Sequence, residues 1–234
     1  MEINLNAEKT GIRIEADPQP VNIEPSRTAV LVVDMQNAFV RKGGYFDTIG
    51  FDLSATEAII EPCKTIITAA REKGMKIIYL QMGFSSDLSD SGGPKSPIWQ
   101  KSRALRLVRE HPEWKEKFYI YGTWGSEIIE ELRPQQGDIV VRKQKYDGFI
   151  GTNLEIILKT LDVRYLLFVG TATNICVETT LRHAFSLGYF PVLISGAVSP
   201  LGPAILQEAT VLNVRATFGW VTTVEKFLNA ARGE

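Results

Sequence analysis

The chain has 234 residues, of which 44% are hydrophobic, enough to bury one sizeable core. Lysine and arginine number 26 against 27 aspartate and glutamate residues, and neither sign forms a long run, which argues against a nucleic-acid or polybasic membrane binder. The N-terminal segment lacks a signal-peptide pattern, and no apolar stretch approaches the ~20 residues that span a bilayer. We therefore expect a cytoplasmic protein whose partner is a small molecule, with no nucleic acid or membrane bound.

The strands are expected from short apolar runs bounded by turn or polar residues. Continuous hydrophobicity, rather than alternation, is typical of strands buried on both faces of a parallel sheet. We expect strands at residues 28–34, 75–81, 138–143, 164–170, 189–195 and 216–223.

Helical patterns lie between these runs. The first, over residues 54–73, opens with Ser54 and Glu57 in the spacing of a capping box, and Pro62 should kink or divide it. Further helices are expected at residues 126–132, 152–161, 174–187, 203–213 and 222–231.

The repeated β-α-β order predicts an α/β fold in three layers. With right-handed crossovers it gives a doubly wound, mainly parallel six-stranded sheet with helices on both faces. We expect residues 27–234 to form a single domain, preceded by an N-terminal arm over residues 1–26. In such a fold, ligands bind outside the carboxyl ends of the strands.

Three chemically useful side chains fall at those carboxyl ends. Asp34 ends the first expected strand, Lys143 ends the third, and Cys176 follows the fourth by one short turn. Each alone has an ordinary explanation, as a turn carboxylate, a solvated lysine or a small buried hydrophobe. Their convergence on one edge of the sheet indicates a catalytic site. The other cysteine, Cys63, lies among apolar residues at helical spacing and is expected in the core as a free thiol.

The chemistry of the three residues is complementary. A helix beginning near Asn174 and the charge of Lys143 should both favour the Cys176 thiolate. Asp34 could take the thiol proton and later return it to a leaving nitrogen. The backbone N–H groups of Ala172 and Cys176 could hold the oxyanion of a tetrahedral intermediate.

Three stretches, "AVLVVDMQNAF", "DIVVRKQKYDGFIGTNLEIIL" and "FVGTATNICVETTLRHAFSLGY", carry a family resemblance. They resemble the isochorismatase-like cysteine hydrolases, whose catalytic triad is Asp, Lys and Cys in that chain order. Asp34, Lys143 and Cys176 occupy those motif positions. The resemblance implies an isochorismatase-like, Rossmann-like fold, a cis peptide bond between Thr171 and Ala172, and a homodimer or homotetramer.

Departures within the family narrow the expected reaction. Nicotinamidases carry a metal site on an Asp-x-His pattern after the second strand, whereas this chain has "LQMGFSSD" there, so we expect no metal and no cofactor. True isochorismate hydrolases lack the nucleophilic cysteine, so its presence implies C–N hydrolysis. Finer stretches such as "RKGGYFD" and "FGWV" look most like the ureidoacrylate amidohydrolases of pyrimidine degradation.

The expected activity is therefore hydrolysis of a ureido or carbamoyl compound through a thiocarbamoyl cysteine, with ureidoacrylate the first candidate substrate. Biuret and triuret hydrolases and N-carbamoyl amino acid amidohydrolases are the enzyme alternatives. The alternatives from other classes are a catalytically idle binding or assembly module, against which the intact triad argues, and a redox-active thiol protein, for which no resolving cysteine lies nearby in sequence.

Other side chains near the strand ends are candidates for the pocket wall. The substrate-binding candidates are Asn37, Phe39, Gln81, Trp99, Tyr146, Phe149 and Asn174. The candidates for binding a substrate carboxylate are Lys101, Arg103, Lys145 and Arg182. The long segment 83–125 is expected to form a pocket wall, a lid or a subunit contact.

Overall fold

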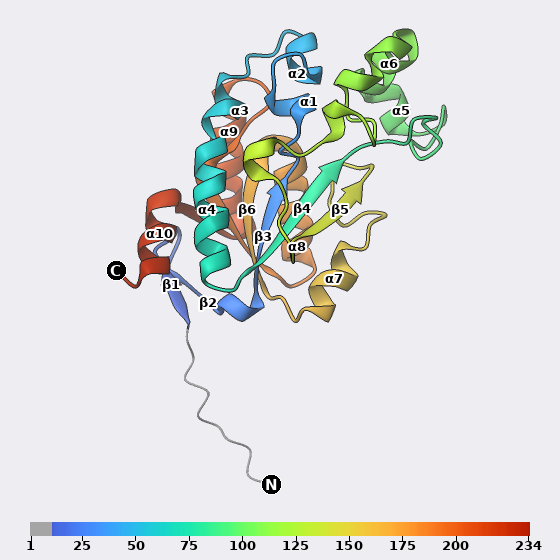
Figure 1. Ribbon diagram of the computed structural model, residues 1–234. Coiled ribbons are helices and arrows are strands. Elements are labelled where there is room, and N and C mark those ends of the chain that lie inside the picture. Colours follow the sequence, from blue (N-terminus) through green and yellow to red (C-terminus); the bar gives the residue numbers. More distant parts are fainter. Residues whose placement is uncertain (1–10) are drawn as a thin grey trace.

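The computed structural model describes residues 11–234 and has a parallel six-stranded sheet at its centre (Figure 1). The strands run in the order β5-β4-β3-β6-β7-β8, and every neighbouring pair is parallel. Their bounds are β3 (Thr28–Val33), β4 (Lys76–Met82), β5 (Ile139–Lys143), β6 (Tyr165–Thr171), β7 (Phe190–Ser199) and β8 (Trp220–Thr223). The expected six-stranded α/β architecture is confirmed. The order reverses between β3 and β6, which makes their carboxyl ends the switch point of the fold.

Helices cover both faces of the sheet. One face carries α3 (Ser54–Ala58), α4 (Ile60–Glu72) and α10 (Val224–Arg232); the other carries α7 (Leu154–Thr160), α8 (Glu178–Ser186) and α9 (Ala204–Asn213). The continuous apolar run of the central strand β3 is explained by its burial, since all six of its residues are buried. Val30 and Val32 belong to one core cluster, whereas Leu31 and Val33 belong to the other.

Shorter elements lie above the carboxyl ends of the strands (Figure 1). The α-helices there are α1 (Asn37–Val40), α2 (Tyr45–Thr48), α5 (Pro97–Lys101) and α6 (Arg103–Glu110). Short 3₁₀ turns span Pro112–Lys117, Trp124–Ser126 and Glu130–Leu132, and a π turn over Thr173–Val177 follows β6. A further 3₁₀ turn, Pro25–Arg27, and a π turn, Val214–Phe218, instead precede β3 and β8 at their amino ends. The carboxyl end of the sheet is therefore roofed by loops and short helices, where a pocket is expected.

The N-terminal residues form a small hairpin of β1 (Ile12–Ile14) and β2 (Val21–Ile23). Asp17 exchanges backbone hydrogen bonds with Val221 of β8, each 2.9 Å long, and the hairpin packs against α10. The first ten residues of the expected arm lie outside the described residues. The domain boundary at residue 27 stays a prediction. No helix among residues 11–234 combines the length and apolar character needed to cross a bilayer.

The start of the first expected helix differs from the prediction. The helix is divided at Ile59, and Pro62 lies in the first turn of α4, where a missing N–H breaks no helical hydrogen bond. The capping box does not form: Ser54 is the first residue of α3, and its N–H donates to the Asp52 carboxylate at 2.9 Å. Asp52 therefore accepts the Ser54 N–H, which in a capping box would have donated to the Glu57 side chain.

Two other expected elements differ in the structure, the first because of long-range backbone pairing and the second because a helix continues into the expected strand. The helix expected at 126–132 is absent, since the chain between the two 3₁₀ turns runs beside the segment after β3. There Ile129 N–H donates to Met35 O, and Asn37 N–H donates to Glu127 O, both at 3.0 Å. The strand expected at 216–223 is limited to β8, because the π turn Val214–Phe218 continues α9 instead.

Candidate active site

The carboxyl ends of β3 and β6 approach each other closely at the switch point. Gly170 of β6 has φ +108°, and a Cβ there would lie 2.2 Å from Val33 O, so only glycine fits. Asp34 follows β3 directly and adopts a positive φ of 50°. The carboxylate of Asp34 is thereby held beside the turn that follows β6.

Asp34 and Lys143 form a fully buried ion pair. The Lys143 Nζ donates to Asp34 Oδ2 at 2.8 Å, although β4 separates their strands. The other carboxylate oxygen, Oδ1, accepts the Met82 N–H at 3.1 Å, and Lys143 Nζ also reaches the Lys145 carbonyl at 3.4 Å. Charges buried this deeply are costly unless they have partners. The Met82 N–H and the Lys145 carbonyl are those further partners, and they help to hold the ion pair in one geometry.

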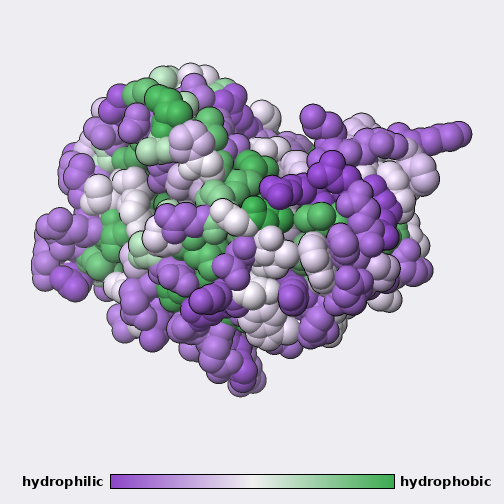
Figure 2. Space-filling view, turned by 90° about the horizontal axis from the view of Figure 1, so that it is seen from above, coloured by the Kyte–Doolittle hydropathy of each residue, from purple (hydrophilic) through white to green (hydrophobic). Residues whose placement is uncertain are grey.

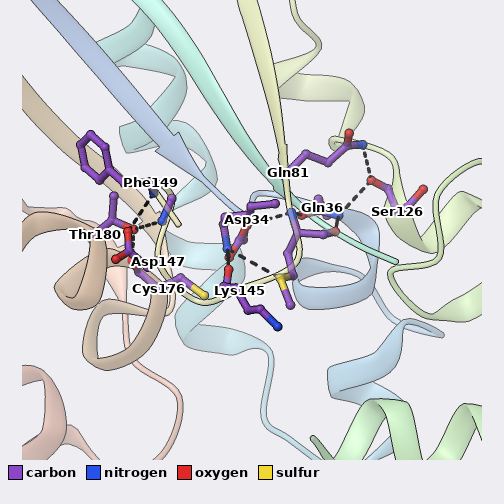
Figure 3. A network of polar contacts seen from close by, with 12 residues as sticks. Asp34, Gln36, Gln81, Ser126, Lys145, Asp147, Phe149, Cys176 and Thr180 are labelled. Carbon is purple, nitrogen blue, oxygen red and sulfur yellow. Dashed lines mark hydrogen bonds and ion pairs between the residues drawn. The ribbon is translucent and has the colours of Figure 1, made fainter. Parts of the chain in front are cut away.

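Cys176 lies in the π turn between β6 and α8, after a cis peptide bond between Thr171 and Ala172. Its sulfur points toward Asp34 (Figure 3). The Thr180 hydroxyl donates to Cys176 O at 2.7 Å and accepts the Gly148 N–H at 2.9 Å. Thr180 therefore ties the turn that carries the cysteine to the loop that follows the strand of Lys143.

The pKa of the Cys176 thiol shifts opposite to the direction that the helix start and Lys143 alone would give. Burial raises the pKa of the Cys176 thiol, the Asp34 carboxylate raises it further, and Lys143 lowers it without offsetting the other two. Burial lowers the pKa of Lys143, but Asp34 and Cys176 outweigh that effect, and the net change is upward. Both directions favour a neutral Cys176 thiol next to the Asp34–Lys143 ion pair.

A cavity of about 90 Å³ opens onto these residues. It is lined by Asp34, Phe39, Tyr45, Phe46, Met82, Ser102, Arg103, Tyr119, Tyr146, Thr171, Ala172, Ile175, Cys176 and Leu201. Both backbone groups expected to form the oxyanion hole, those of Ala172 and Cys176, belong to residues of this wall. The view from above (Figure 2) shows hydrophobic residues in green surfacing near the middle of this face, framed by hydrophilic residues in purple.

Two of the seven expected substrate-binding residues, Phe39 and Tyr146, line the cavity. The two amides expected to bind the ureido group do not. Asn37 Nδ2 donates to Trp124 O and Gln81 Nε2 donates to Ser126 O, both at 2.8 Å, and both residues line a separate surface groove. The backbone carbonyls of the 124–126 turn thus accept the hydrogen bonds that these amides were expected to donate to the ureido group.

The other three candidates also serve structural contacts. Trp99 stacks under the Arg109 guanidinium at 4.1 Å. Phe149 is buried against the rings of His183 and Tyr189. Asn174 exchanges hydrogen bonds with the backbone of Leu201, at 3.1 and 2.9 Å, and so positions a residue of the cavity wall without lining the cavity itself.

Among the four candidates for a carboxylate partner, Arg103 lines the cavity and the other three do not. Arg182 is paired with Glu178 at 2.5 Å and stacks on Phe218. Arg103 begins α6, whose N-cap is Ser102. Segment 83–125 is therefore a pocket wall, since it contributes Ser102, Arg103 and Tyr119.

Several residues of the site were missed by sequence reasoning. Gln36 is fully buried and clamps two loops: its Oε1 accepts the Met82 N–H, and its Nε2 donates to the carbonyls of Met82 and Ser126 (Figure 3). Tyr45 and Tyr119 line the cavity from distant segments. The signal was present for two of them, because Gln36 lies within "DMQNAF" and Tyr45 within "RKGGYFD".

The comparisons with known proteins agree with this geometry. A model of the Isochorismatase domain matches residues 28–226. The chain belongs to the isochorismatase family. Among curated relatives in this family, a ureidoacrylate amidohydrolase (RutB) of Agrobacterium fabrum is 48% identical over 92% of this chain and 94% of its own length. A ureidoacrylate amidohydrolase (RutB) of Klebsiella pneumoniae is 44% identical over 94% of this chain and 93% of its own length.

Solved structures of isochorismatase-like hydrolases share the fold. A cysteine hydrolase from Pseudomonas syringae pv. phaseolicola superposes with a TM-score of 0.74 at 28% identity, covering 97% of this chain and 99% of its own. An N-carbamoylsarcosine amidase from Thermoplasma acidophilum has a TM-score of 0.61 at 25% identity, covering 84% and 95% of the two chains. The family and fold expected from the sequence motifs are confirmed. Within residues 11–234, no three His, Cys, Asp or Glu side chains cluster closely enough to hold a metal ion.

Proposed function

We propose that this protein is an amidohydrolase that cleaves ureidoacrylate between the ureido carbonyl and the acrylate-bearing nitrogen. The observation that carries the proposal is the buried Asp34–Lys143 ion pair beside a cavity that Asp34 and Cys176 both line, with the Cys176 sulfur pointing toward Asp34 (Figure 3). Because burial raises the pKa of this thiol, it needs a general base before it can attack, and we assign that role to Asp34. Relatives at 44% and 48% identity, named ureidoacrylate amidohydrolases, support the substrate.

The proposed reaction has two halves. In the first, Asp34 takes the Cys176 proton, and the sulfur attacks the ureido carbonyl to form a tetrahedral intermediate. The N–H groups of Ala172 and Cys176 stabilise its oxyanion, and Lys143 holds the Asp34 carboxylate in line. Asp34 then returns the proton to the departing nitrogen, which releases aminoacrylate and leaves a thiocarbamoyl cysteine.

Water completes the cycle. It attacks the thiocarbamoyl carbon while Asp34 accepts the water proton, and Asp34 then passes that proton to the sulfur as the C–S bond breaks. The products are the free thiol and carbamic acid, which loses a proton to solvent to give carbamate. Carbamate then decomposes to ammonia and carbon dioxide. No step requires an oxidant, a reductant or a metal ion.

The charge at the cavity mouth supports an anionic substrate. Arg103 lines the cavity beside Tyr45. Burial raises the pKa of Tyr45 to about 12, although Arg103 and Arg106 act to lower it, so its hydroxyl stays a donor near these cations. We propose that Arg103 and Tyr45 bind the acrylate carboxylate at the end of the cavity remote from the sulfur. Biuret and triuret carry no carboxylate and would leave this cation without a partner.

A substrate panel tests this proposal. Ammonia release is measured with ureidoacrylate, biuret, triuret, N-carbamoyl amino acids and nicotinamide, and acid-quenched enzyme is weighed by mass spectrometry. We expect the highest kcat/KM with ureidoacrylate and a carbamoyl adduct on Cys176. Preference for a neutral urea would contradict the substrate, and absence of any ammonia would favour the idle binding module. The expected cytoplasmic location and homo-oligomeric assembly stay predictions here.

A further inference from the structure

The loop after β5, residues 144–149, bears on both the buried ion pair and the cavity wall. The Lys145 carbonyl of this loop accepts a hydrogen bond from Lys143 Nζ at 3.4 Å, and the Tyr146 side chain lines the cavity. Tyr146 is also 43% exposed, so the loop separates the cavity from solvent. Contacts that fix this loop therefore fix the surroundings of the buried lysine and one wall of the site together.

One attachment of the loop to α8 lies close to the nucleophile. Gly148 N–H donates to the Thr180 hydroxyl at 2.9 Å, and that hydroxyl donates to the Cys176 carbonyl at 2.7 Å (Figure 3). A Cβ at Gly148 would lie 2.6 Å from a methyl carbon of Leu80 and 3.0 Å from one of Thr180, so glycine allows this close approach. A single contact of this kind fixes one point of a loop without fixing its direction.

A second attachment lies one turn further along α8. His183 Nδ1 and Asp147 Oδ2 are 2.6 Å apart, and because a carboxylate only accepts, Nδ1 carries the proton. The other oxygen of Asp147 accepts the Phe149 N–H at 2.8 Å, and the ring of Phe149 lies 5.0 Å from the imidazole between centroids. Thr180 and His183 are three residues apart on the helix, so they present the two attachments from one side of it.

This pair is more enclosed than an ordinary surface ion pair. The side chain of Asp147 is 13% exposed and that of His183 is 29% exposed, whereas Lys159 and Glu155 pair on α7 at 70% and 40% exposure. Exposed pairs contribute little because water screens them. Both oxygens of Asp147 are occupied, one by α8 and one by the backbone of the loop, so the carboxylate joins the two segments in one geometry.

We propose that Asp147 and His183, which we call the clasp, are positioning residues for the reaction. By adding a second point of attachment, the clasp fixes the direction of the loop, which keeps Tyr146 on the cavity wall and the Lys145 carbonyl on Lys143. Both clasp residues lie outside the cavity wall, so they act through their neighbours in the chain. The inference rests on the proposed function only in taking the ion pair and the thiol as catalytic.

Steady-state ammonia release with ureidoacrylate tests the clasp in His183→Ala and His183→Asn. Asparagine places its amide nitrogen close to where the imidazole Nδ1 lies, so it keeps the donor to Asp147. We expect His183→Ala to raise KM about tenfold and lower kcat about threefold, because small displacements of a cavity wall or a buried charge are costly. His183→Asn should stay within about threefold of the wild-type kcat/KM. Lys159→Ala is the matched control, since it removes the exposed ion pair of α7, and it should behave as the wild type.

Iodoacetamide labelling of Cys176 provides a readout that needs no substrate. Loss of the clasp lets the loop open locally, so the thiol should be alkylated about threefold faster in His183→Ala and at nearly the wild-type rate in His183→Asn. Peptide mass spectrometry separates the two cysteines, and Cys63, buried in the core, should stay unlabelled while the chain is folded. If the wild type releases no ammonia from ureidoacrylate, the proposed substrate is wrong, and labelling still tests the clasp.

A double-mutant cycle tests whether the two residues act as one unit. Asp147→Ala should lose at least as much kcat/KM as His183→Ala, since it also frees the Phe149 N–H. The double variant should be no more than about threefold slower than Asp147→Ala alone. Losses that multiply in the double variant, or wild-type kinetics and labelling in His183→Ala, would overturn the proposal. A His183→Asn chain as impaired as His183→Ala would equally overturn it, because the Nδ1 hydrogen bond would then not position the loop.

Discussion

Arg103 should decide between acidic and neutral substrates. Replacing it with glutamine removes the cation that lines the cavity while keeping a polar, uncharged side chain there. The carboxylate of bound ureidoacrylate would then lose its ionic partner inside a cavity whose wall includes five aromatic side chains. A neutral urea makes no such contact, so its binding should be unaffected.

The size of the effect follows from where Arg103 lies. A fully buried charge pair broken on one side costs ~3–5 kcal/mol, but Arg103 is exposed on its solvent side, where water screens it. We therefore expect a loss of ~1.4–2.7 kcal/mol, which is a tenfold to hundredfold rise in KM for ureidoacrylate. Because Arg103 would contact the substrate carboxylate equally in the bound substrate and in the transition state, kcat should change little.

The assay is initial-rate ammonia release with ureidoacrylate and with biuret for the wild type, Arg103→Gln and Lys101→Gln. Lys101 is the matched control, since it ends α5 two residues before Arg103 and does not line the cavity. Raising the salt concentration should raise KM for ureidoacrylate in the wild type and have less effect in Arg103→Gln. Equal losses for both substrates, or an equal loss in Lys101→Gln, would refute the assignment of Arg103.

Four further predictions concern the buried groups. Cys176→Ala should lower kcat by about 10⁴-fold or more and leave thermal melting near that of the wild type, so near-normal turnover would exclude the covalent route. Lys143→Met should lower the free energy of unfolding by ~3–5 kcal/mol, because it leaves Asp34 buried without its partner; adding Asp34→Asn should recover part of this loss in urea titrations. Prolonged dialysis against EDTA should leave kcat/KM unchanged, since the described residues offer no cluster of metal ligands; activity restored by a divalent ion would contradict this. Burial raises the pKa of Cys63 to about 12, so the folded state holds that proton more tightly than the unfolded chain. Stability should therefore fall as pH rises from about 9 toward 12, by up to ~4 kcal/mol from this group, and Cys63→Ala should show a shallower fall.

Much of the site could be predicted because its parts follow directly after buried strands. A run such as residues 28–33 has six apolar or β-branched residues, and in the structure all six are buried between two helical layers. The residue after such a strand must lie at the carboxyl edge of the sheet, whatever the loops do. This placed Asp34 and Lys143 at one edge and Cys176 one turn beyond it. The fold class and the three central residues were accordingly available from the sequence.

The cavity wall could not be predicted in the same way. Its side chains come from the short helices after β3 and from segment 83–125, and they meet because the backbone after β3 pairs with residues 127–129. That pairing replaced the helix expected at 126–132 and used the side chains of Asn37 and Gln81 for backbone carbonyls. Local sequence patterns contain no information about which distant carbonyl an amide will reach.

The charge state of the nucleophile was decided by tertiary structure for the same reason. The sequence places Cys176 near the start of a helix, which by itself favours a thiolate. In the folded chain the sulfur is buried beside Asp34, and Lys143, which would favour the thiolate, is already paired with that carboxylate. The sign of the pKa shift depends on distances from Asp34 to Lys143 and Cys176, both more than a hundred residues further along the chain. The sequence by itself determined which residues meet at the sheet edge; the three-dimensional packing alone determined how their charges balance, because burial and Coulomb energy depend on separation in space.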